Sequence, residues 1–386
     1  MDMKFFRIIL RVLFLITLLL FMSVCSAEEA FRVEDAGLDL NGDLSIHYPV
    51  LSGDTALTKQ INGLIQERCG IGEYLTRAAQ LLSGGSLRTE WRGAVLDDVF
   101  SCTVSASGAL KDTRPTHVWT AVTVDLRDGH EIAFSELFID EEEAREWIET
   151  YLEEYVAPEL SAHLQNGELT PLPDTFCLDK AGLTLLYPVE QLSTLSDRAG
   201  DIHIGWNELK DELDLGEDSI PARIGVENMI TLSAQSTEQL RKSAEKGLLT
   251  GIPVKIGDSM QELTDYWHML TDPDGFEGGR LFSLEGGCFR GVYLMTDDLS
   301  RGWQDSKVEG IRMDQGCLWG LCISDTPRTE WLCELGEPDG SAEIGEEKAE
   351  SIRVVPGICD YYRCGEYLLQ LYSDTDGTLV SIMLTE

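Results

Sequence analysis

The chain has 386 residues, 43% of them hydrophobic, which is enough for two or three globular domains. Acidic residues outnumber basic ones by 68 to 30, and the formal net charge at pH 7 is −38. A field of this sign repels nucleic acids and anionic lipid surfaces and attracts basic proteins. We therefore expect no nucleic-acid ligand. High acidity also serves solubility alone, so charge by itself does not identify a partner.

The N-terminus has the pattern of a signal peptide. Lys4 and Arg7 supply the positive start, residues 12–24 form one apolar run, and Ser26 and Ala27 suit cleavage before the mature chain. The apolar run is short for a membrane span. We predict a signal peptide over 1–27 and a secreted or cell-surface location. The alternative is an uncleaved anchor, through which alone the protein would contact a membrane.

The next region, 28–213, is predicted to be an α+β domain built on an antiparallel sheet with amphipathic helices. Alternating apolar residues predict strands at 44–48, 98–105 and 118–126, and helical spacing predicts a helix over 55–67. Further along, turn residues between apolar runs predict a hairpin over 176–187.

The clearest helix of this region is predicted from Asp140 to about Ala157, because apolar residues recur at steps of three and one. Glu141, Glu142 and Glu143 lie in its first turn, where carboxylates favour the positive end of the helix dipole. We treat these three residues as a candidate acidic rim of a partner-binding surface.

Residues 214–250 are polar and are predicted to be a linker that contains one exposed helix. Residues 251–386 look internally repeated. The segment 256–260 and the segment 323–327, at an offset of 67 residues, each start a helix that strand-like runs follow. We predict a two-copy domain of helix plus β-meander, although two capped helices can also resemble each other by chance.

Two sets of residues carry resemblances to known families. The first comprises Tyr48-Pro49, Ile61-Asn62, Phe134 to Phe138, Gly182-Leu183 with Tyr187-Pro188, and Gly200 to Leu209. In order and spacing they resemble the extracytoplasmic domain of lysozyme-sensing anti-sigma factors (RsiV-like), which also precedes some peptidoglycan deacetylases. The resemblance covers about 37–213 and implies binding of a lysozyme-like basic protein or of peptidoglycan. Residues 251–386 more weakly resemble tandem β-lactamase-inhibitor-like modules, which bind other proteins.

Cysteines crowd the C-terminal region. In an exported chain they are first disulfide candidates, and six of them lie together in the sequence: Cys288, Cys317, Cys322, Cys333, Cys359 and Cys364. Cys359 and Cys364 flank four residues, few enough for a hairpin loop, so these two cysteines could pair directly. If Cys317 and Cys322 both lie in one strand, they face opposite sides of it and cannot pair. We expect at least two disulfides here; a zinc site of four thiolates is the alternative.

No catalytic motif is present. The six histidines form no His-Glu-x-x-His pair, and there is neither a nucleophile elbow nor a phosphate loop. The run 374–377 hints at a calcium loop but fits a turn between strands better. We therefore predict a non-enzymatic exported binding protein without a metal or cofactor. The alternatives are a cell-wall hydrolase that uses paired carboxylates such as Asp97-Asp98, and a structural envelope protein.

Overall fold

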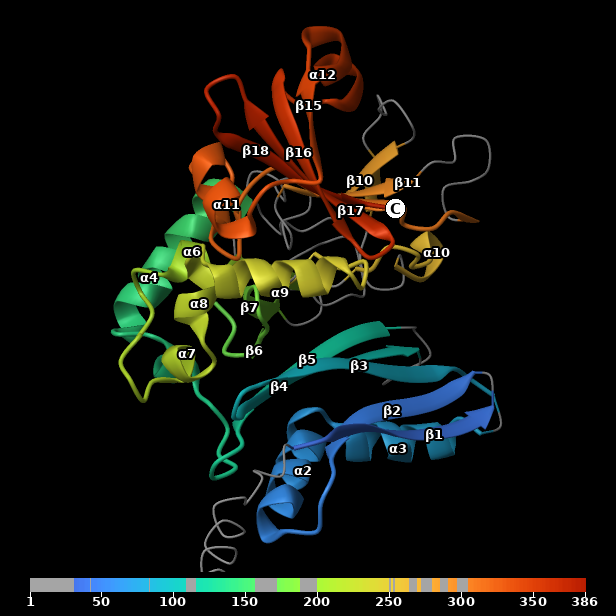
Figure 1. Cartoon of the computed structure of the whole chain (residues 1–386). Helices are drawn as coiled ribbons and strands as arrows, with labels where there is room; N and C mark the ends of the chain where they lie inside the picture. The colour runs from blue at the N-terminus through green and yellow to red at the C-terminus, as the bar shows by residue number, and fades with distance from the viewer. Residues whose placement is uncertain are drawn as a thin grey trace, which may run out of the picture.

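The computed structural model describes residues 31–41, 43–82, 84–108, 116–156, 172–187, 200–249, 251–252, 254–263, 269–271, 280–284, 291–296 and 305–386. These residues form helices and mostly antiparallel sheets, which confirms the α+β class. Figure 1 shows a blue and teal sheet at one end, a green and yellow helical middle part, and an orange and red sheet at the other end. The predicted signal peptide lies outside the described residues. Among the described helices, none has the length and apolar character that a membrane crossing needs.

The first sheet has five strands in sequence order. They are β1 (Val33–Asn41), β2 (Leu44–Leu51), β3 (Leu87–Leu96), β4 (Val99–Gly108) and β5 (Thr116–Asp125). Only β2 and β3 run parallel, and a parallel pair needs a crossover connection. Helices α2 (Ala56–Arg68) and α3 (Ile71–Gln80) supply that connection and cover one face of the sheet.

Helix α2 forms where the sequence predicted it. Thr55 caps its N-terminus in a reciprocal arrangement with Thr58, which satisfies backbone N–H groups that lack helical partners. Ile61 and Ile65 on its inner face are fully buried against residues of β4 and β5. Burial of each such side chain contributes about 1.5–3 kcal/mol, so this face fixes the helix on the sheet.

The middle part has its own core, made by short helices around a three-stranded meander. Its elements are η1 (Phe134–Leu137), α4 (Glu141–Tyr151), η2 (Leu152–Val156), β6 (Phe176–Leu178), β7 (Gly182–Tyr187), β8 (Gly200–Gly205), α6 (Trp206–Leu209), α7 (Ile220–Arg223) and α8 (Val226–Ile230). The predicted hairpin over 176–187 is present as β6 and β7. Trp206 is fully buried and its indole N–H donates to the carbonyl oxygen of Asp179 in the hairpin turn, at 3.0 Å.

The large sheet has eight antiparallel strands in the order β15-β16-β17-β18-β12-β11-β10-β9. They are β9 (Met269–Thr271), β10 (Arg280–Leu284), β11 (Val292–Thr296), β12 (Gly310–Met313), β15 (Gly340–Ile344), β16 (Gly357–Cys364), β17 (Tyr367–Asp374) and β18 (Leu379–Thr385). The order is symmetrical about the β12–β18 pair, as two joined four-stranded meanders require.

The helices before the two meanders occupy matching places. Helix α10 (Met260–Leu263) precedes β9 to β12, and α11 (Arg328–Leu335) precedes β15 to β18. The N–H of Gly257 donates to the carbonyl oxygen of Val308, and the N–H of Ser324 donates to that of Leu379, each at 2.7 Å. Gly257 and Ser324 are separated by the offset of the predicted repeat, so the two copies share local hydrogen bonding as well as strand order.

The prediction of an exposed helix in a linker is wrong for α9 (Ala234–Ala244). Leu240 and Ala244 are fully buried in the core of the large sheet. The guanidinium of Arg241 lies 4.9 Å from the ring centroid of Tyr362 in β16. The buried stripe of α9 also contains Ser236 and Thr237, so its sequence looked polar. The hydroxyl groups of Ser236 and Thr237 donate hydrogen bonds to backbone carbonyl oxygens of the same segment, so these small side chains can be buried.

On its opposite face the large sheet carries α12 (Glu346–Ile352). Arg312 of β12 is 4% exposed and holds the end of this helix in place. Its guanidinium donates to the carbonyl oxygens of Ile352 and Arg353, and its Nε donates to Asp314. The charge of Arg312 is thereby neutralised within the sheet, and the end of α12 is tied to a central strand.

Candidate functional site

Two distant segments meet beside the N-terminus of α4. Phe138 and Leu213 form a single antiparallel bridge, the N–H of Ile139 donates to the carbonyl oxygen of Glu212, and the N–H of Asp214 donates to that of Leu137, both at 3.0 Å. Phe138 and Leu213 are buried in the core of the middle part, and so is Leu137, whereas Ile139 is exposed and Glu212 is partly exposed.

Ile139 is the most exposed large apolar side chain among the described residues, at 74%. It lies directly before the N-cap of α4, and Glu212 lies opposite it across the bridge. We call Ile139, Asp140, Glu142, Glu143 and Glu212 the Ile139 patch. An apolar centre with a polar rim is the usual composition of a protein-binding surface.

The carboxylates of the Ile139 patch are mostly unpaired. Asp140 accepts hydrogen bonds from the backbone N–H groups of Glu142 and Glu143, at 2.9 and 3.2 Å, as an N-cap. Within the described part of the chain, Glu142, Glu143 and Glu212 form no ion pair. The positive end of the α4 dipole lowers the cost of gathering these charges.

Of the three glutamates predicted as an acidic rim, Glu142 and Glu143 belong to this patch and Glu141 does not. Glu141 is committed to the protein itself, since its carboxylate accepts from Nε of Arg145 at 2.9 Å. Glu142 and Glu143 are exposed. The sequence did not single out Ile139, because an isoleucine between a buried phenylalanine and a helix N-cap looks like a core residue until the pairing of 137–139 with 212–214 is known.

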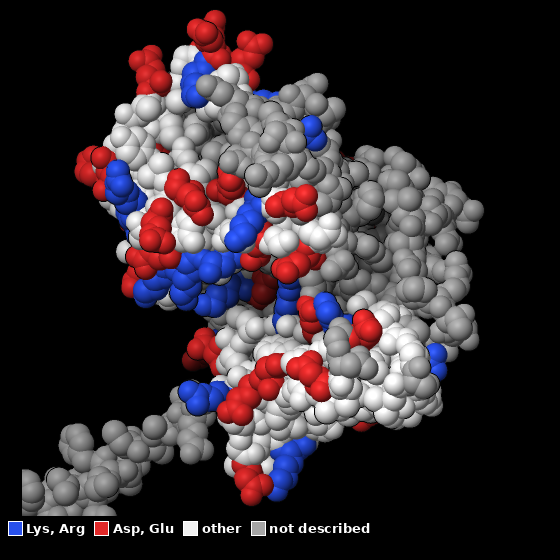
Figure 2. Space-filling model, turned by 90° about the vertical axis from the view of Figure 1, so that its right-hand side faces the viewer, with Lys and Arg blue, Asp and Glu red and all other residues white. Residues whose placement is uncertain are grey.

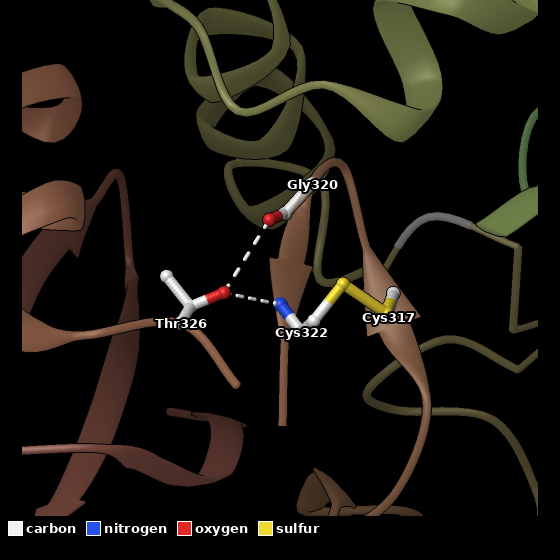
Figure 3. The surroundings of a disulfide bond; sticks show 4 residues. All are labelled: Cys317, Gly320, Cys322 and Thr326. Atoms are coloured by element: carbon white, nitrogen blue, oxygen red, sulfur yellow. Dashed lines mark hydrogen bonds between the residues drawn. A yellow bond between two sulfur atoms is a disulfide. The ribbon is translucent and has the colours of Figure 1, made fainter. Parts of the chain in front are cut away.

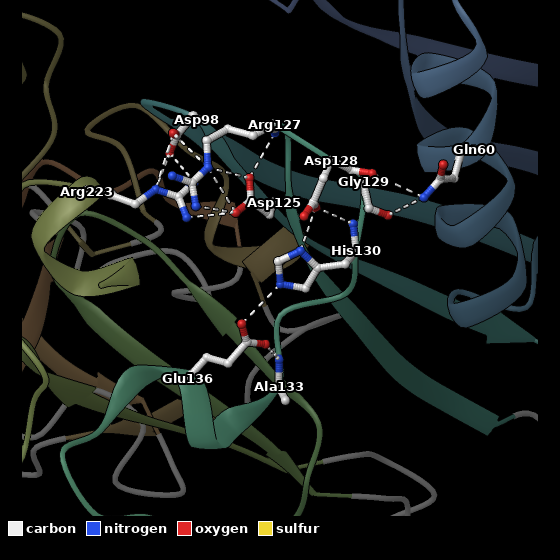
Figure 4. A network of polar contacts seen from close by, with 10 residues as sticks. All are labelled: Gln60, Asp98, Asp125, Arg127, Asp128, Gly129, His130, Ala133, Glu136 and Arg223. Carbon is white, nitrogen blue, oxygen red and sulfur yellow. Dashed lines mark hydrogen bonds and ion pairs between the residues drawn. The ribbon is translucent and has the colours of Figure 1, made fainter. Parts of the chain in front are cut away.

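A second polar cluster joins the first sheet to the middle part (Figure 4). Asp125, at the end of β5 and fully buried, accepts from Arg223 of α7 at 2.7 Å and from Arg127 at 3.0 Å. Arg223 also binds Asp98 at 2.6 Å. Burial alone would raise the pKa of Asp125, but the two guanidiniums hold it well below the usual range. These ion pairs connect the first sheet to α7 of the middle part.

Asp125, Asp128 and His130 are, within the described residues, the one group that could supply three metal ligands. The ligand atoms lie within 4.8 Å of one another. However, two guanidiniums already occupy the carboxylate of Asp125, and His130 uses both ring nitrogens on carboxylates. A divalent cation here would sit beside fixed positive charges, so the donor set does not suit a metal, and we assign the cluster a structural role.

We expect His130 to make the stability of the protein depend on pH. Its Nδ1 lies 2.6 Å from Asp128 and its Nε2 3.1 Å from Glu136, and chiefly the first contact raises the pKa of His130. The pKa of a histidine in the unfolded chain is about 6.5. Because the pKa of His130 is higher in the folded state, protonation of His130 stabilises the fold fully at pH values below about 6.5. This stabilisation is lost as the pH rises through the pKa of His130 in the folded state.

His130→Gln should therefore be less stable than the wild type near about pH 5.5, by less than about 1 kcal/mol because the ring is partly exposed. The difference should shrink as the pH rises. Thermal melts of both proteins across this range measure it, and a difference that is constant with pH would contradict the assignment.

The cysteine pairing is the reverse of the prediction (Figure 3). Strands β13 (Cys317–Leu318) and β14 (Leu321–Cys322) form a tight hairpin, and Cys317 is bonded to Cys322. The hairpin is held by Thr326, whose hydroxyl accepts from the N–H of Cys322 at 2.7 Å. Residues 317 and 322 are not in one strand, because the chain reverses between them.

Cys359 and Cys364 are unpaired and both lie in β16, which turns only after Cys364. They point to opposite faces of the strand, one into each core beside the large sheet. Cys333 is exposed on α11 and unpaired. Cys288 lies outside the described residues. The described thiols therefore provide one disulfide in this region, and they do not gather into the alternative zinc site.

A cavity of about 90 Å³ lies where the middle part meets the large sheet. Its polar lining includes His203 of β8, Glu208 of α6 and Gln315. His203 is half-buried here, and its Nδ1 lies 3.1 Å from the hydroxyl of Thr184.

Comparison with known proteins finds solved structures of low similarity to this chain. No family model and no curated protein matches the chain. A DUF3298 family member from Bacteroides fragilis is similar with a TM-score of 0.40 and 12% identity, covering 51% of this chain and 98% of its own. A DUF3298 family protein from Pseudomonas aeruginosa has a TM-score of 0.34, 11% identity, and coverages of 48% and 96%. A DUF4309 family protein from Bacillus subtilis has a TM-score of 0.27, 14% identity, and coverages of 40% and 97%.

Proposed function

We propose that this protein is a non-enzymatic extracytoplasmic binding protein whose Ile139 patch recognises a basic extracellular protein of the lysozyme type. The observation that carries the proposal is Ile139, which is 74% exposed and lies among carboxylates that form no ion pair with any described residue. The resemblance of 37–213 to RsiV-like domains supports the same class of partner. An extracytoplasmic location belongs to the proposal, and the N-terminal signal pattern and the disulfide between Cys317 and Cys322 support it.

The charge of the rest of the molecule favours a basic partner. The chain has 30 basic residues, and several arginines are already neutralised by internal carboxylates. Those pairs are Arg68 with Glu131, Arg127 and Arg223 with Asp125, Arg145 with Glu141, Arg312 with Asp314, and Arg328 with Asp360. Figure 2 shows acidic side chains over both the upper and the lower part of one face, with a group of basic side chains between them. Such a field steers a cationic protein toward the molecule.

The state of the carboxyl groups disfavours the alternative of a cell-wall hydrolase. A glycosidase needs one carboxylic acid whose pKa is raised toward neutrality. Among the described carboxyl groups with a shifted pKa, every shift is downward: Asp39, Asp125, Asp128, Glu238 and Asp360. Asp98, of the adjacent pair considered for this role, is bound by two arginines.

We expect Ile139→Ser to weaken the binding of lysozyme by about tenfold or more, since loss of an apolar centre costs more than about 1.4 kcal/mol at an interface. Calorimetric titration at low and at physiological salt measures the effect. Leu82→Ser is the matched control, because Leu82 is also an exposed apolar residue, at 58%, but lies beyond the end of α3 and outside the patch.

Charge attraction alone would show a different pattern. Exposed charges are screened beyond a Debye length of about 8 Å at physiological ionic strength. Affinity that vanishes at that salt, or that basic cytochrome c matches, would overturn specific recognition by the patch. Equal effects of the two serine substitutions would do the same. Robust turnover of peptidoglycan, abolished by one Asp or Glu substitution, would overturn the non-enzymatic assignment.

A further inference from the structure

Strand β1 is an open edge of the first sheet. Within the described residues it pairs with β2 alone, in a regular register from Val33 to Asp39 that ends at a bulge. None of residues 33–40 is buried. The opposite edge of the sheet, β5, is partly covered, because Val124 forms a bridge with Glu131. An edge strand presents the N–H and C=O groups of alternate residues outward, so β1 can accept a further strand.

One face of β1 is apolar. Ala36 and Leu38 lie opposite Tyr48 and Ile46 of β2, and residues directly opposite each other in an antiparallel pair share a face. Ile46 is fully buried beside α3. Leu38 is 42% exposed, and Leu40 is 39% exposed. The apolar surface that α3 covers on β2 therefore continues, uncovered, onto the edge strand.

The other face of β1 carries carboxylates around the imidazole of His47. The ring lies over Gly37, where a Cβ would be 2.5 Å from Cε1 of the imidazole. Nδ1 of His47 lies 2.7 Å from the carboxylate of Asp35, and Nε2 lies 3.3 Å from that of Asp39. With Glu34, the strand has three carboxylates and no basic residue. Even when His47 is protonated, the edge is negative.

These charges disfavour a second copy of this chain as the added strand. An antiparallel pair of β1 strands centred on Gly37 would place Asp35 of each copy opposite Asp39 of the other. Like charges directly opposite each other destabilise a sheet. The net charge of −38 also opposes the approach of two copies. A basic segment would form favourable cross-strand pairs at the same positions.

We propose that the free edge of β1 is a second interaction surface, which accepts an extended basic segment of another protein as an added antiparallel strand. Backbone hydrogen bonds supply affinity in this mode of recognition, and the alternate side chains supply specificity. The surface belongs to the first sheet and the Ile139 patch belongs to the middle part. The proposal therefore does not rest on the partner proposed for that patch.

The two faces of β1 specify the sequence of the added strand. Residues opposite Asp35 and Asp39 should be lysine or arginine, and residues opposite Ala36 and Leu38 should be apolar. The residue opposite Gly37 should be small, because the ring of His47 already covers that position. A blocked peptide with the core Lys-Val-Thr-Val-Lys meets these requirements, and one with the core Glu-Val-Thr-Val-Glu does not.

Fluorescence anisotropy of the labelled peptides with the full chain, at physiological salt, tests the charge requirement. The lysine peptide should bind and the glutamate peptide should not. Asp39→Lys should weaken binding of the lysine peptide by about fivefold. Glu347→Lys is the control, because it changes the net charge equally at an exposed position of α12, at the other end of the molecule (Figure 1). Equal losses in the two variants would mean charge attraction only and would overturn the proposal.

Backbone methylation of the lysine peptide tests strand addition itself. N-methyl groups on the odd residues block one edge of an extended peptide, and N-methyl groups on the even residues block the other. Only one of the two methylated peptides should lose binding to the wild type, by about tenfold or more. Equal binding of both would overturn the proposal. So would the absence of binding by the unmethylated peptide up to about 1 mM, or a wild-type dimer in sedimentation that Leu38→Lys dissociates.

Discussion

Replacement of Arg328 by methionine should lower the free energy of unfolding by about 3–5 kcal/mol, the usual cost of leaving a buried charge without its partner. Asp360 of β16 is fully buried beside the large sheet. Its two carboxylate oxygens each accept from Arg328 at 2.7 Å, and Ser341 and Trp331 donate as well. Arg328 is the only described cation that pairs with Asp360, so no neighbour can replace it.

Denaturant unfolding of wild type and Arg328→Met at neutral pH measures this loss. Lys242→Met is the control, because Lys242 and Glu238 form an exposed pair on α9 and such a pair contributes less than about 1 kcal/mol. A second substitution, Asp360→Asn, should recover much of the loss caused by Arg328→Met, since it removes the uncompensated charge. Equal destabilisation by Arg328→Met and Lys242→Met would contradict the argument.

The pH dependence of the same variant provides an independent check. Burial alone would raise the pKa of Asp360, but the hydrogen bonds from Arg328 and Ser341 lower it overall. A lowered pKa gives stability that is present above the unfolded value of about 3.9 and is lost as pH falls through the folded value. The difference between wild type and Arg328→Met should therefore be large at neutral pH and should decrease in acid.

The secondary structure was predictable where apolar periodicity was strong. Helix α2 and strands β4 and β5 lie where periods of 3.6 or 2 predicted them, and Thr58, Ile61 and Ile65 of α2 are buried at helical spacing. Helix α9 was misjudged because its buried stripe uses Ser236 and Thr237 beside Leu240. Local hydrogen bonds satisfy those hydroxyl groups, and hydrophobicity alone does not record that.

Both errors in cysteine pairing come from turns. The reversal between Cys317 and Cys322 is made by Trp319 and Gly320, which both have positive φ, 53° and 78°. Asn-Gly or Asp-Gly is the usual signal for such a two-residue turn, and Trp-Gly is not. The loop predicted between Cys359 and Cys364 is a continuous strand, because the true turn lies at Gly365, two residues before β17 begins.

The candidate sites were only half visible in the sequence. Glu141, Glu142 and Glu143 were recognisable in the sequence as a run of like charges. The exposure of Ile139 could not be predicted without the bridge between Phe138 and Leu213. Contacts such as that bridge depend on the packing of segments far apart in the chain.

Gly320→Ala should destabilise the protein by about 2–4 kcal/mol and should displace the disulfide hairpin from α8 and α9. A Cβ at Gly320 would lie 2.1 Å from the backbone nitrogen of Leu232 and 2.4 Å from the carbonyl carbon of Thr231. Backbone cannot rotate away as a flexible side chain can, so the hairpin or the segment between α8 and α9 must move. The positive φ of 78° adds backbone strain of about 1 kcal/mol for alanine.

Gly225→Ala separates the two contributions to this loss. Gly225 also has a φ of 78°, with a ψ of 30°, but a Cβ there would meet only Nδ2 of Asn228, at 3.8 Å. Its replacement should therefore cost only the strain of about 1 kcal/mol. Urea unfolding of the two variants and the wild type, under oxidising conditions that keep the bond between Cys317 and Cys322, measures the difference. If both substitutions cost the same, the close approach of the hairpin to Leu232 has no energetic consequence, and the contact between the middle part and the large sheet must be held elsewhere.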